Sequence, residues 1–240
     1  MEKLLITGAN GFVGSRIAHA VHTHYDLLTP SHSECDITSA KAVEVYVRQH
    51  RPQAILHLAA LSNTGYCEEH PEASYQVNVV GVENIAAAAA RFDAKLVFFS
   101  SDQVYNGNCE QGLLSEEITL SPENHYGRHK RMAEVRALQL CPNSVALRAT
   151  WMYDNTREGM PTHNNFVRNI KEALRLHTPY ILPHENIAAS HGSTKWYTTS
   201  YIRFNYLVAY TTLERRTPST PTRQPSPTSL CCHPTHIISL

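Results

Sequence analysis

Short apolar runs alternate with stretches of helical periodicity along most of this chain. Apolar runs of strand length predict buried strands, and the longer stretches, in which apolar residues recur every three or four positions, predict amphipathic helices. We expect strands at 3–7, 25–30, 53–60, 95–101, 143–150 and 180–183, and helices at 11–23, 37–50, 78–92, 126–140 and 164–176. Thr38 or Ser39 is the expected N-cap of the second helix.

The expected strands are continuous hydrophobic segments, and helices separate them along the chain. Such strands are typical of a parallel sheet that helices cover on both faces. The consecutive alanines at 86–90 suit a helix that packs closely on a sheet. The pattern therefore predicts an α/β fold, a Rossmann-like doubly wound parallel sheet, over residues 1–188.

A glycine-rich turn, "TGANGFVG", follows the first expected strand and opens the first helix. Gly8 permits the tight turn, Gly11 lets backbone N–H groups approach a pyrophosphate, and Gly14 lets the helix pack closely on the strand. Because the strand–turn–helix context is present, we predict a dinucleotide site here.

The end of the second expected strand bears on the choice of dinucleotide. An acid at this position would hold the ribose hydroxyls of NAD, but the strand ends "TPSH" with no acid. Ser31 and His32 tolerate a 2′-phosphate better than a carboxylate would. The sequence favours NADP and leaves NAD as the alternative.

The sequence "YGRHK" places Tyr126 and Lys130 one helical turn apart, on the same face of a helix. A neighbouring ammonium favours the phenolate, so the pair can pass a proton to or from a substrate oxygen. The strand at 95–101 ends in the hydroxyls of Ser100 and Ser101, at the edge of the sheet where ligands bind. Ser101, Tyr126 and Lys130 are therefore the candidate catalytic residues for hydride transfer to or from a carbonyl, with Tyr126 as proton donor.

These motifs, in this order, resemble an extended short-chain dehydrogenase/reductase. The segments "CDIT", "HLAALSNTGYCEEHPEASYQVNVVGVENIA", "SSDQVYNG", "YGRHKRMAE" and "LRATWMYD" are similar to the dTDP-4-dehydrorhamnose reductase family of sugar-nucleotide enzymes. The resemblance covers residues 3–187. It implies NADPH-dependent reduction of a 4-keto sugar nucleotide and a small substrate lobe, which would be incomplete in this chain.

The resemblance also implies a set of binding residues. For the cofactor they are Gly8, Gly11, Phe12, Val13 and Gly14 at the pyrophosphate, Asp36 and Ile37 at the adenine, Ala59 and Ala60 at the nicotinamide-side ribose, and Ser100, Tyr126 and Lys130. For the sugar nucleotide they are Ser101, Asp102 and Trp151. Ser101 stands where the family usually has threonine, a change that keeps the hydroxyl. Arg148 is interpreted as a structural ion-pair partner rather than a catalyst.

Two alternatives to a reductase remain open. One is an epimerase or dehydratase of the same superfamily, which would retain NAD and show no net oxidation. The other is a catalytically inactive subunit that keeps only the cofactor-binding fold.

Composition narrows the class of protein further. Lys plus Arg and Asp plus Glu number 21 each, so no bulk charge favours a nucleic acid partner. No apolar stretch approaches the roughly 20 residues that span a membrane, and "MEKLLITG" does not read as a secretory signal. The six cysteines show no metal-ligand spacing, so we expect reduced thiols, no metal and a cytoplasmic protein. These residues indicate no oligomeric state.

The composition changes near Ala189. From there to Leu240 threonine and proline accumulate, Glu214 is the only acidic residue, and the alternation of strand and helix is lost. Such a segment buries too little apolar surface to order itself, so 189–240 is expected to be a disordered tail. One hypothesis is a shift of reading frame near 187–191, because permitted back-translations in another frame give a helical pattern and a strand similar to the family's own.

Overall fold

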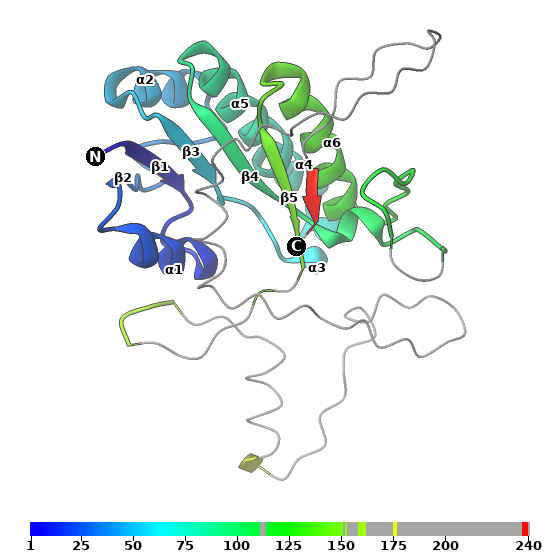
Figure 1. The fold of residues 1–240 in the computed structure, drawn as a ribbon. Coiled ribbons are helices and arrows are strands. Elements are labelled where there is room, and N and C mark those ends of the chain that lie inside the picture. The colour runs from blue at the N-terminus through cyan, green and yellow to red at the C-terminus, as the bar shows by residue number, and fades with distance from the viewer. Residues whose placement is uncertain (111–113, 151, 153–157, 162–174, 177–236, 240) are drawn as a thin grey trace, which may run out of the picture.

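The computed structural model describes residues 1–110, 114–150, 152, 158–161, 175–176 and 237–239. Its strands are β1 (Lys3–Thr7), β2 (Asp26–Leu28), β3 (Ala54–His57), β4 (Lys95–Ser101), β5 (Val145–Ala149) and β6 (Ile237–Ser239). They form one sheet in the order β2-β1-β3-β4-β5-β6, and every neighbouring pair is parallel (Figure 1). The predicted α/β fold with a doubly wound parallel sheet is confirmed.

The helices of the described part are α1 (Phe12–Val21), α2 (Ala40–His50), α3 (Thr64–Glu69), α4 (Pro71–Tyr75), α5 (Gly81–Arg91) and α6 (His125–Leu140). A π-helical turn, Gln76–Val80, joins α4 to α5, and a 3₁₀ turn, Asp102–Tyr105, follows β4. Of the two N-caps considered for α2, Ser39 is the one observed, since its hydroxyl accepts a hydrogen bond from Ala42 N.

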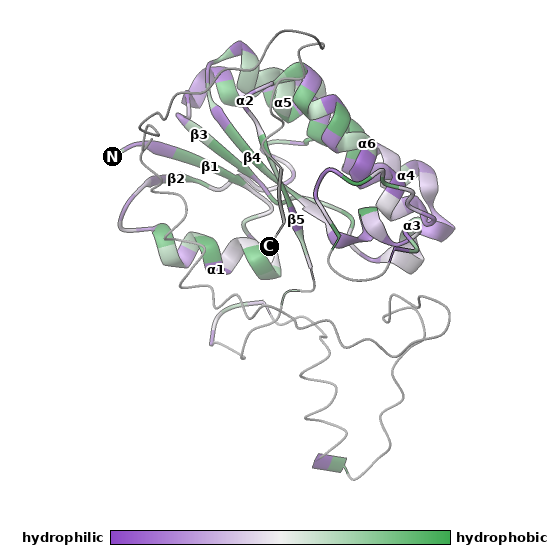
Figure 2. Ribbon diagram, turned by 45° about the vertical axis from the view of Figure 1, so that its right-hand side comes forward, coloured by the Kyte–Doolittle hydropathy of each residue, from purple (hydrophilic) through white to green (hydrophobic). Residues whose placement is uncertain are grey.

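Two hydrophobic clusters lie on opposite faces of the sheet. Figure 1 shows α2, α5 and α6 on one face and α1 on the other. The first cluster contains Leu5, Ile55 and Phe98 of the sheet with the small residues of α5 and α6, and the second contains Ile6 and Ile17. In Figure 2 the hydrophobic residues accordingly concentrate on the central strands. Strands buried on both faces explain the continuous apolar runs in the sequence.

The order of the strands fixes where a ligand can bind. The connections from β1 and β3 leave in opposite directions, so the carboxyl ends of these two strands are the switch point at which sheets of this kind form a ligand-binding crevice. The glycine turn follows β1, and Ala59 and Ala60 follow β3. The sheet therefore brings the two predicted cofactor segments to one place.

Several predicted segments lie outside the described residues. The expected helix at 164–176 is described only at 175–176, and the expected strand at 180–183 is not described. Of the segment 189–240, the structure describes 237–239, which pair with β5 in the register Ala146 to Ile237. The boundary at 188 therefore stays a prediction.

Candidate active site

The glycine turn leaves no room for a side chain at Gly8 or Gly14. Gly8 has a φ of +73°, in the left-handed region, and a Cβ there would lie 2.7 Å from Ala59 N at the end of β3. A Cβ on Gly14 would lie 2.2 Å from Gly8 O. The three predicted glycines therefore form a closed turn, in which Gly11 N donates to Gly8 O at 3.0 Å.

The helix that follows begins at a glycine. Gly11 is the N-cap of α1, and no side-chain hydrogen bond caps this helix end. The positive end of the helix dipole favours an anion at this position. The turn and α1 thus have the shape and charge that a dinucleotide pyrophosphate needs.

Sequence analysis missed Arg16, one turn into α1. Its guanidinium is buried, lies 3.8 Å from the centroid of the Phe12 ring and donates to Phe12 O at 2.8 Å. It also donates to Pro161 O at 3.2 Å. Arg16 could have been predicted from the sequence, because an arginine directly after the glycine turn places a cation beside the predicted pyrophosphate.

The predicted adenine residues lie in the connection from β2 to α2. Asp36 Oδ1 accepts hydrogen bonds from Thr38 Oγ1 at 2.7 Å and Thr38 N at 2.9 Å, and these lower the pKa of the Asp36 carboxyl. Ile37 is buried in the cluster that includes α5, and its carbonyl accepts a hydrogen bond from Asn84. Asp36 is thus an ionised capping group of the turn.

The turn after β2 carries an acid that the argument for NADP did not include. Glu34 Oε2 accepts hydrogen bonds from Ser31 Oγ at 2.7 Å and from Ser31 N at 2.8 Å. The backbone hydrogen bond and then the hydroxyl lower the pKa of the Glu34 carboxyl. A folded turn therefore brings a carboxylate back to Ser31, which strand-end residues alone could not reveal.

A buried histidine connects the ends of β1 and β3. His57 Nδ1 and Thr7 Oγ1 form a hydrogen bond of 2.7 Å, and His57 Nε2 has no hydrogen-bond partner among the described residues. Burial, and secondarily the charge of Lys130, lowers the pKa of His57 to about 3. His57 is thus a neutral group between the glycine turn and the predicted catalytic pair.

Asn78 is a second residue that sequence analysis missed. It lies in the π-helical turn, is fully buried, and holds Leu61 through both backbone groups: its Oδ1 accepts from Leu61 N at 3.0 Å and its Nδ2 donates to Leu61 O at 2.9 Å. π-Helical turns are frequent at functional sites because they reorient one side chain. Asn78 thereby fixes the segment that carries Ala59 and Ala60.

The strand β4 ends in two serines with different partners. Ser100 Oγ donates to Glu134 Oε1 at 2.6 Å, away from the turn that follows β4. Ser101 Oγ donates to Asp102 Oδ1 at 3.1 Å and accepts from Gln103 N, so Ser101 caps the 3₁₀ turn. Burial raises the pKa of Asp102, whose Oδ2 accepts a hydrogen bond from Thr150.

Ser101 lies beside the predicted proton donor. Burial raises the pKa of the Tyr126 phenol well above its usual range, and a hydrogen bond with Ser101 opposes that shift. Asp102 adds to the rise through its negative charge. The phenol is therefore protonated at neutral pH.

Lys130 is buried under Tyr126. Its Nζ donates to Phe99 O at 2.8 Å and lies 5.7 Å from the centroid of the Tyr126 ring. Burial lowers the pKa of Lys130 to about 8, against the opposing charge of Glu134. The structure thus brings Ser101, Tyr126 and Lys130 to one place at the carboxyl end of β4.

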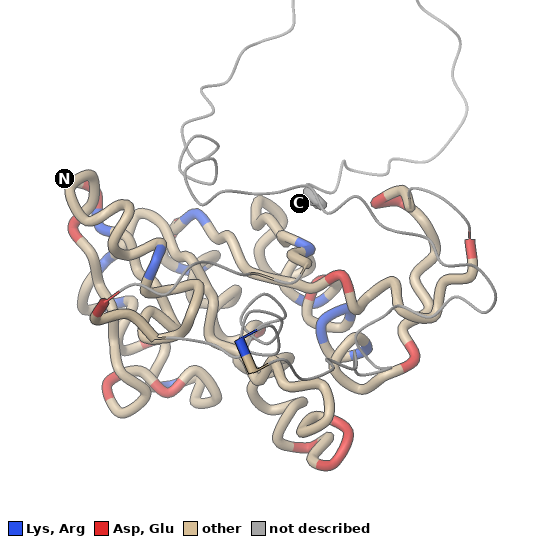
Figure 3. Tube along the Cα trace, turned by 90° about the horizontal axis from the view of Figure 1, so that it is seen from below, with Lys and Arg blue, Asp and Glu red and all other residues tan. Residues whose placement is uncertain are grey.

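Trp151, a predicted substrate residue, lies outside the described residues. Within the described ranges, no three histidine, cysteine, aspartate or glutamate side chains are grouped so that they could hold a metal ion. The helices of the same part of the chain are all too short or too polar to cross a bilayer. Acidic and basic residues are interspersed along the described trace (Figure 3), in keeping with the balanced composition.

Known proteins share this arrangement. A family model described as "RmlD substrate binding domain" matches residues 1–180, which agrees with the resemblance over 3–187. A dTDP-4-dehydrorhamnose reductase of Aggregatibacter actinomycetemcomitans is 32% identical over 172 residues, covering 71% of this chain and 56% of that protein. The chain therefore spans about half the length of the curated relatives it matches.

Two solved structures are similar in fold and sequence. A dTDP-4-dehydrorhamnose reductase from Yersinia enterocolitica has a TM-score of 0.68 at 28% identity, covering 73% of this chain and 61% of that one. A dTDP-4-dehydrorhamnose reductase from Bacillus anthracis str. Ames, in complex with NADP, has a TM-score of 0.65 at 28% identity, covering 73% and 60%.

Proposed function

This chain belongs to the family of the RmlD substrate binding domain, and on that premise we propose that it reduces a 4-keto sugar nucleotide with NADPH. The observation that carries the proposal is the position of Ser101, Tyr126 and Lys130 at the carboxyl end of β4, beside the crevice between β1 and β3. When bound, NADPH supplies a hydride to the carbonyl carbon.

The glycine turn fits such a cofactor. Side chains at Gly8 and Gly14 would fill the space that the closed turn needs, and the positive end of the α1 dipole, which begins at Gly11, favours the pyrophosphate. Arg16 adds a cation near that helix end. Asp36, Ile37, Ala59 and Ala60 are the proposed contacts of the adenosine and the ribose on the nicotinamide side.

Tyr126 has the protonation state that a reduction requires. A carbonyl oxygen gains negative charge as the hydride arrives, and it must receive a proton. Burial keeps the Tyr126 phenol protonated, so its O–H can donate that proton, while the Ser101 hydroxyl beside it holds the same oxygen. The Lys130 ammonium under the ring favours the phenolate that remains.

Substrate and cofactor class are supported by relatives. The relatives named dTDP-4-dehydrorhamnose reductase support a nucleotide-sugar substrate, with Asp102 and Trp151 as further proposed contacts. The NADP complex of the Bacillus anthracis relative supports NADP. Ser31 and His32 are the proposed neighbours of the 2′-phosphate, and NAD remains the second candidate because the Glu34 carboxylate lies at Ser31.

The test is the oxidation of NADPH, followed by its absorbance, with and without a dTDP-linked 4-keto-6-deoxy sugar. The full chain is expected to consume NADPH only with the sugar present, and Tyr126→Phe is expected to lower kcat by about 100-fold or more with little change in cofactor affinity. Glu83→Gln, on α5, is the control for a change outside the site.

Two outcomes would contradict the proposal. Tight NADPH binding without turnover would favour a cofactor-binding subunit. Interconversion of sugar nucleotides with a retained NAD and no net oxidation would favour an epimerase or dehydratase.

A further inference from the structure

A carboxylate is fully buried two helical turns beyond Tyr126. Glu134 lies on α6, one turn after Lys130, and its side chain has no solvent exposure. A buried carboxylate is costly unless its charge is paired and its oxygens are hydrogen-bonded. The groups that pair with the Glu134 carboxylate therefore indicate its role.

Each carboxylate oxygen of Glu134 accepts two hydrogen bonds. Oε1 accepts from Ser100 Oγ at 2.6 Å and from Arg148 Nε at 2.9 Å. Oε2 accepts from Arg148 Nη2 at 2.8 Å and from Arg131 Nη1 at 3.3 Å. The ion pair with Arg148, predicted from sequence to be structural, is thus a two-bond contact that fixes orientation as well as charge.

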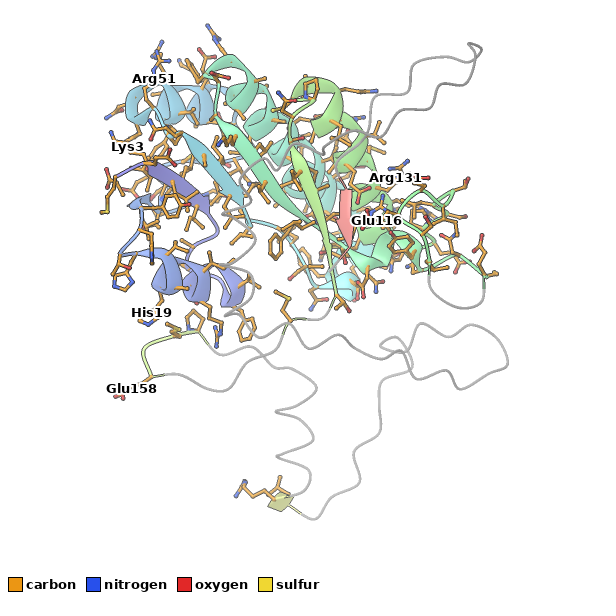
Figure 4. The ribbon with its side chains drawn as sticks, viewed as in Figure 1. Lys3, His19, Arg51, Glu116, Arg131 and Glu158 are labelled. Atoms are coloured by element: carbon orange, nitrogen blue, oxygen red, sulfur yellow. The ribbon has the colours of Figure 1, made fainter. Side chains whose placement is uncertain are left out.

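The same guanidinium extends the network beyond α6 and the sheet. Arg148 Nη1 donates to Tyr105 Oη at 2.6 Å, in the 3₁₀ turn, and to Glu116 O at 3.0 Å. Figure 4 shows Glu116 on the same side of the molecule as Arg131 of α6. Glu134 is therefore the point at which α6, β4, β5 and the turn after β4 are joined.

Two adjacent residues of β4 are tied to α6 in this way. Phe99 O accepts from Lys130 Nζ, and Ser100 Oγ donates to Glu134. The next residue is Ser101, which contacts Tyr126. The distance between Ser101 and the Tyr126 phenol thus depends on the contacts that Phe99 and Ser100 make with α6.

The charge of Glu134 has a second consequence for Lys130. Burial lowers the pKa of Lys130, and the Glu134 carboxylate is the strongest group that opposes this, followed by the Cys67 thiol. The other groups that face Lys130 are Tyr126 on α6 and the neutral His57 at the end of β3. An apolar pair at 134 and 148 could stabilise the fold as well as the ion pair does, but it would not supply this charge.

On the premise of the proposed function, we propose that Glu134 is a positioning residue of the site, which fixes Ser100 and α6 relative to each other and supplies the negative charge that keeps Lys130 an ammonium. It acts through Ser100 and Lys130 and does not itself touch the reacting atoms.

The first test needs no turnover. The full chain is labelled with ¹³C-lysine, the Lys130 signal is assigned by its loss in Lys130→Arg, and its titration is followed by NMR. In Glu134→Gln the midpoint is expected about one pH unit or more below that of the unsubstituted chain, because a buried negative charge has been removed. Glu83→Gln is the matched control, since it removes an ion pair of α6 that does not involve Glu134, the one with Arg136, and should leave the midpoint unchanged.

A second variant guards against misfolding of the first. Glu134→Gln leaves Arg148 as an unpaired buried charge, whereas Glu134→Gln with Arg148→Met removes both charges. The double variant is also expected to titrate below the unsubstituted chain, because Glu134 acts on Lys130 more strongly than Arg148 does. Equal Lys130 midpoints in the double variant and in Glu83→Gln would overturn the proposal and leave Glu134 a purely structural group.

Kinetics separate this inference from the proposed function. If the unsubstituted chain reduces the sugar nucleotide, kcat is expected to fall as the pH rises and Lys130 loses its proton. This fall should occur at a lower pH in the double variant than in Glu83→Gln, with an unchanged KM for NADPH. If it does not, the proposed function fails, while the NMR titration still decides the role of Glu134.

Discussion

Thr7 Oγ1 and His57 Nδ1, 50 residues apart in the chain, form a buried hydrogen bond of 2.7 Å between the ends of β1 and β3. This pair lies where the connections from β1 and β3 leave in opposite directions. The glycine turn follows Thr7, and Lys130 is close enough to His57 for its charge to act on the imidazole. A buried histidine that is held neutral therefore lies at this switch point, and this has a consequence for the stability of the fold in acid.

His57 is expected to make the protein less stable as the pH falls. Its pKa is about 3 in the fold, below the ordinary value of 6.5, so the unfolded chain binds a proton that the folded chain refuses. The free energy of unfolding should therefore fall below pH 6.5 by up to about 1.4 kcal/mol per pH unit from this group. His57→Gln should reduce that slope in urea unfolding at pH 7.5 to 5, and the exposed His19→Gln should not; equal slopes in all three proteins would contradict the prediction.

Gly14→Ala is expected to disrupt the glycine turn. The added Cβ would lie 2.2 Å from Gly8 O, a backbone atom that cannot move without opening the turn. We expect a loss of about 1–3 kcal/mol in the free energy of unfolding and no measurable NADPH binding by calorimetry. Gly65→Ala, where the nearest atom is a side-chain oxygen at 3.4 Å, is the control. Normal binding by Gly14→Ala would exclude the turn as the pyrophosphate site.

Asn78→Ala is expected to release the segment after β3. It removes both hydrogen bonds to the backbone of Leu61, at a cost of about 1–3 kcal/mol because the groups are buried. NADPH affinity should fall as well, since Ala59 and Ala60 precede Leu61. Asn106→Ala, which removes the hydrogen bonds of the Asn106 side chain with Glu123 N and Gln103 Oε1, should leave affinity unchanged. A loss of stability without any loss of affinity would separate Asn78 from the cofactor site.

Glu34→Gln is expected to increase the preference for NADPH over NADH. The ionised Glu34 carboxylate at Ser31 repels a 2′-phosphate and accepts hydrogen bonds from ribose hydroxyls. The ratio of the two dissociation constants, measured by fluorescence titration, should shift several-fold toward NADPH. Glu44→Gln, on α2, serves for comparison; a ratio that is the same in both variants would place the 2′-position away from Ser31.

The segment 189–240 is proposed to remain accessible to proteases. Its low apolar content predicts cleavage after about residue 188 under conditions that leave the sheet intact, with mass spectrometry to locate the cuts. Resistance equal to that of residues 1–110 would contradict the disorder. The separate hypothesis of a shifted reading frame is tested by sequencing the gene through this region, where an unshifted frame would exclude it.

Apolar runs were sufficient to predict β1 to β5 because a parallel sheet buries both faces of each strand, but β6 lies in a segment that was expected to be disordered. They missed α3 and α4, which are short and carry few apolar residues. The cap of α3 is local chemistry, in which Asn63 Oδ1 accepts from Tyr66 N at 2.9 Å, and Pro71 then begins α4. Periodicity is weak in helices of one or two turns, so only such caps could have revealed them.

The residues of the candidate site likewise divide into those that the sequence could predict and those that it could not. Gly8, Gly14, Tyr126 and Lys130 could be predicted from sequence as site residues because their chemistry depends on spacing within one segment. Glu134 and Arg148 were not placed together because the sequence cannot show that a charged position of α6 faces the sheet. Contacts between elements that are distant in the sequence, such as that of Asn78 with Leu61, depend on the connections between elements, which carry no periodic signal.

The ion pair of Glu134 and Arg148 also sets an order for the folding of the chain during synthesis. Glu134 leaves the ribosome before Arg148 does, and a buried carboxylate without its partner opposes the docking of α6 on the sheet. Parallel strands add a further delay, because each must wait for the crossover helix that precedes its neighbour. We therefore expect nascent chains that end before β5 to bind no nucleotide, although the glycine turn is already complete.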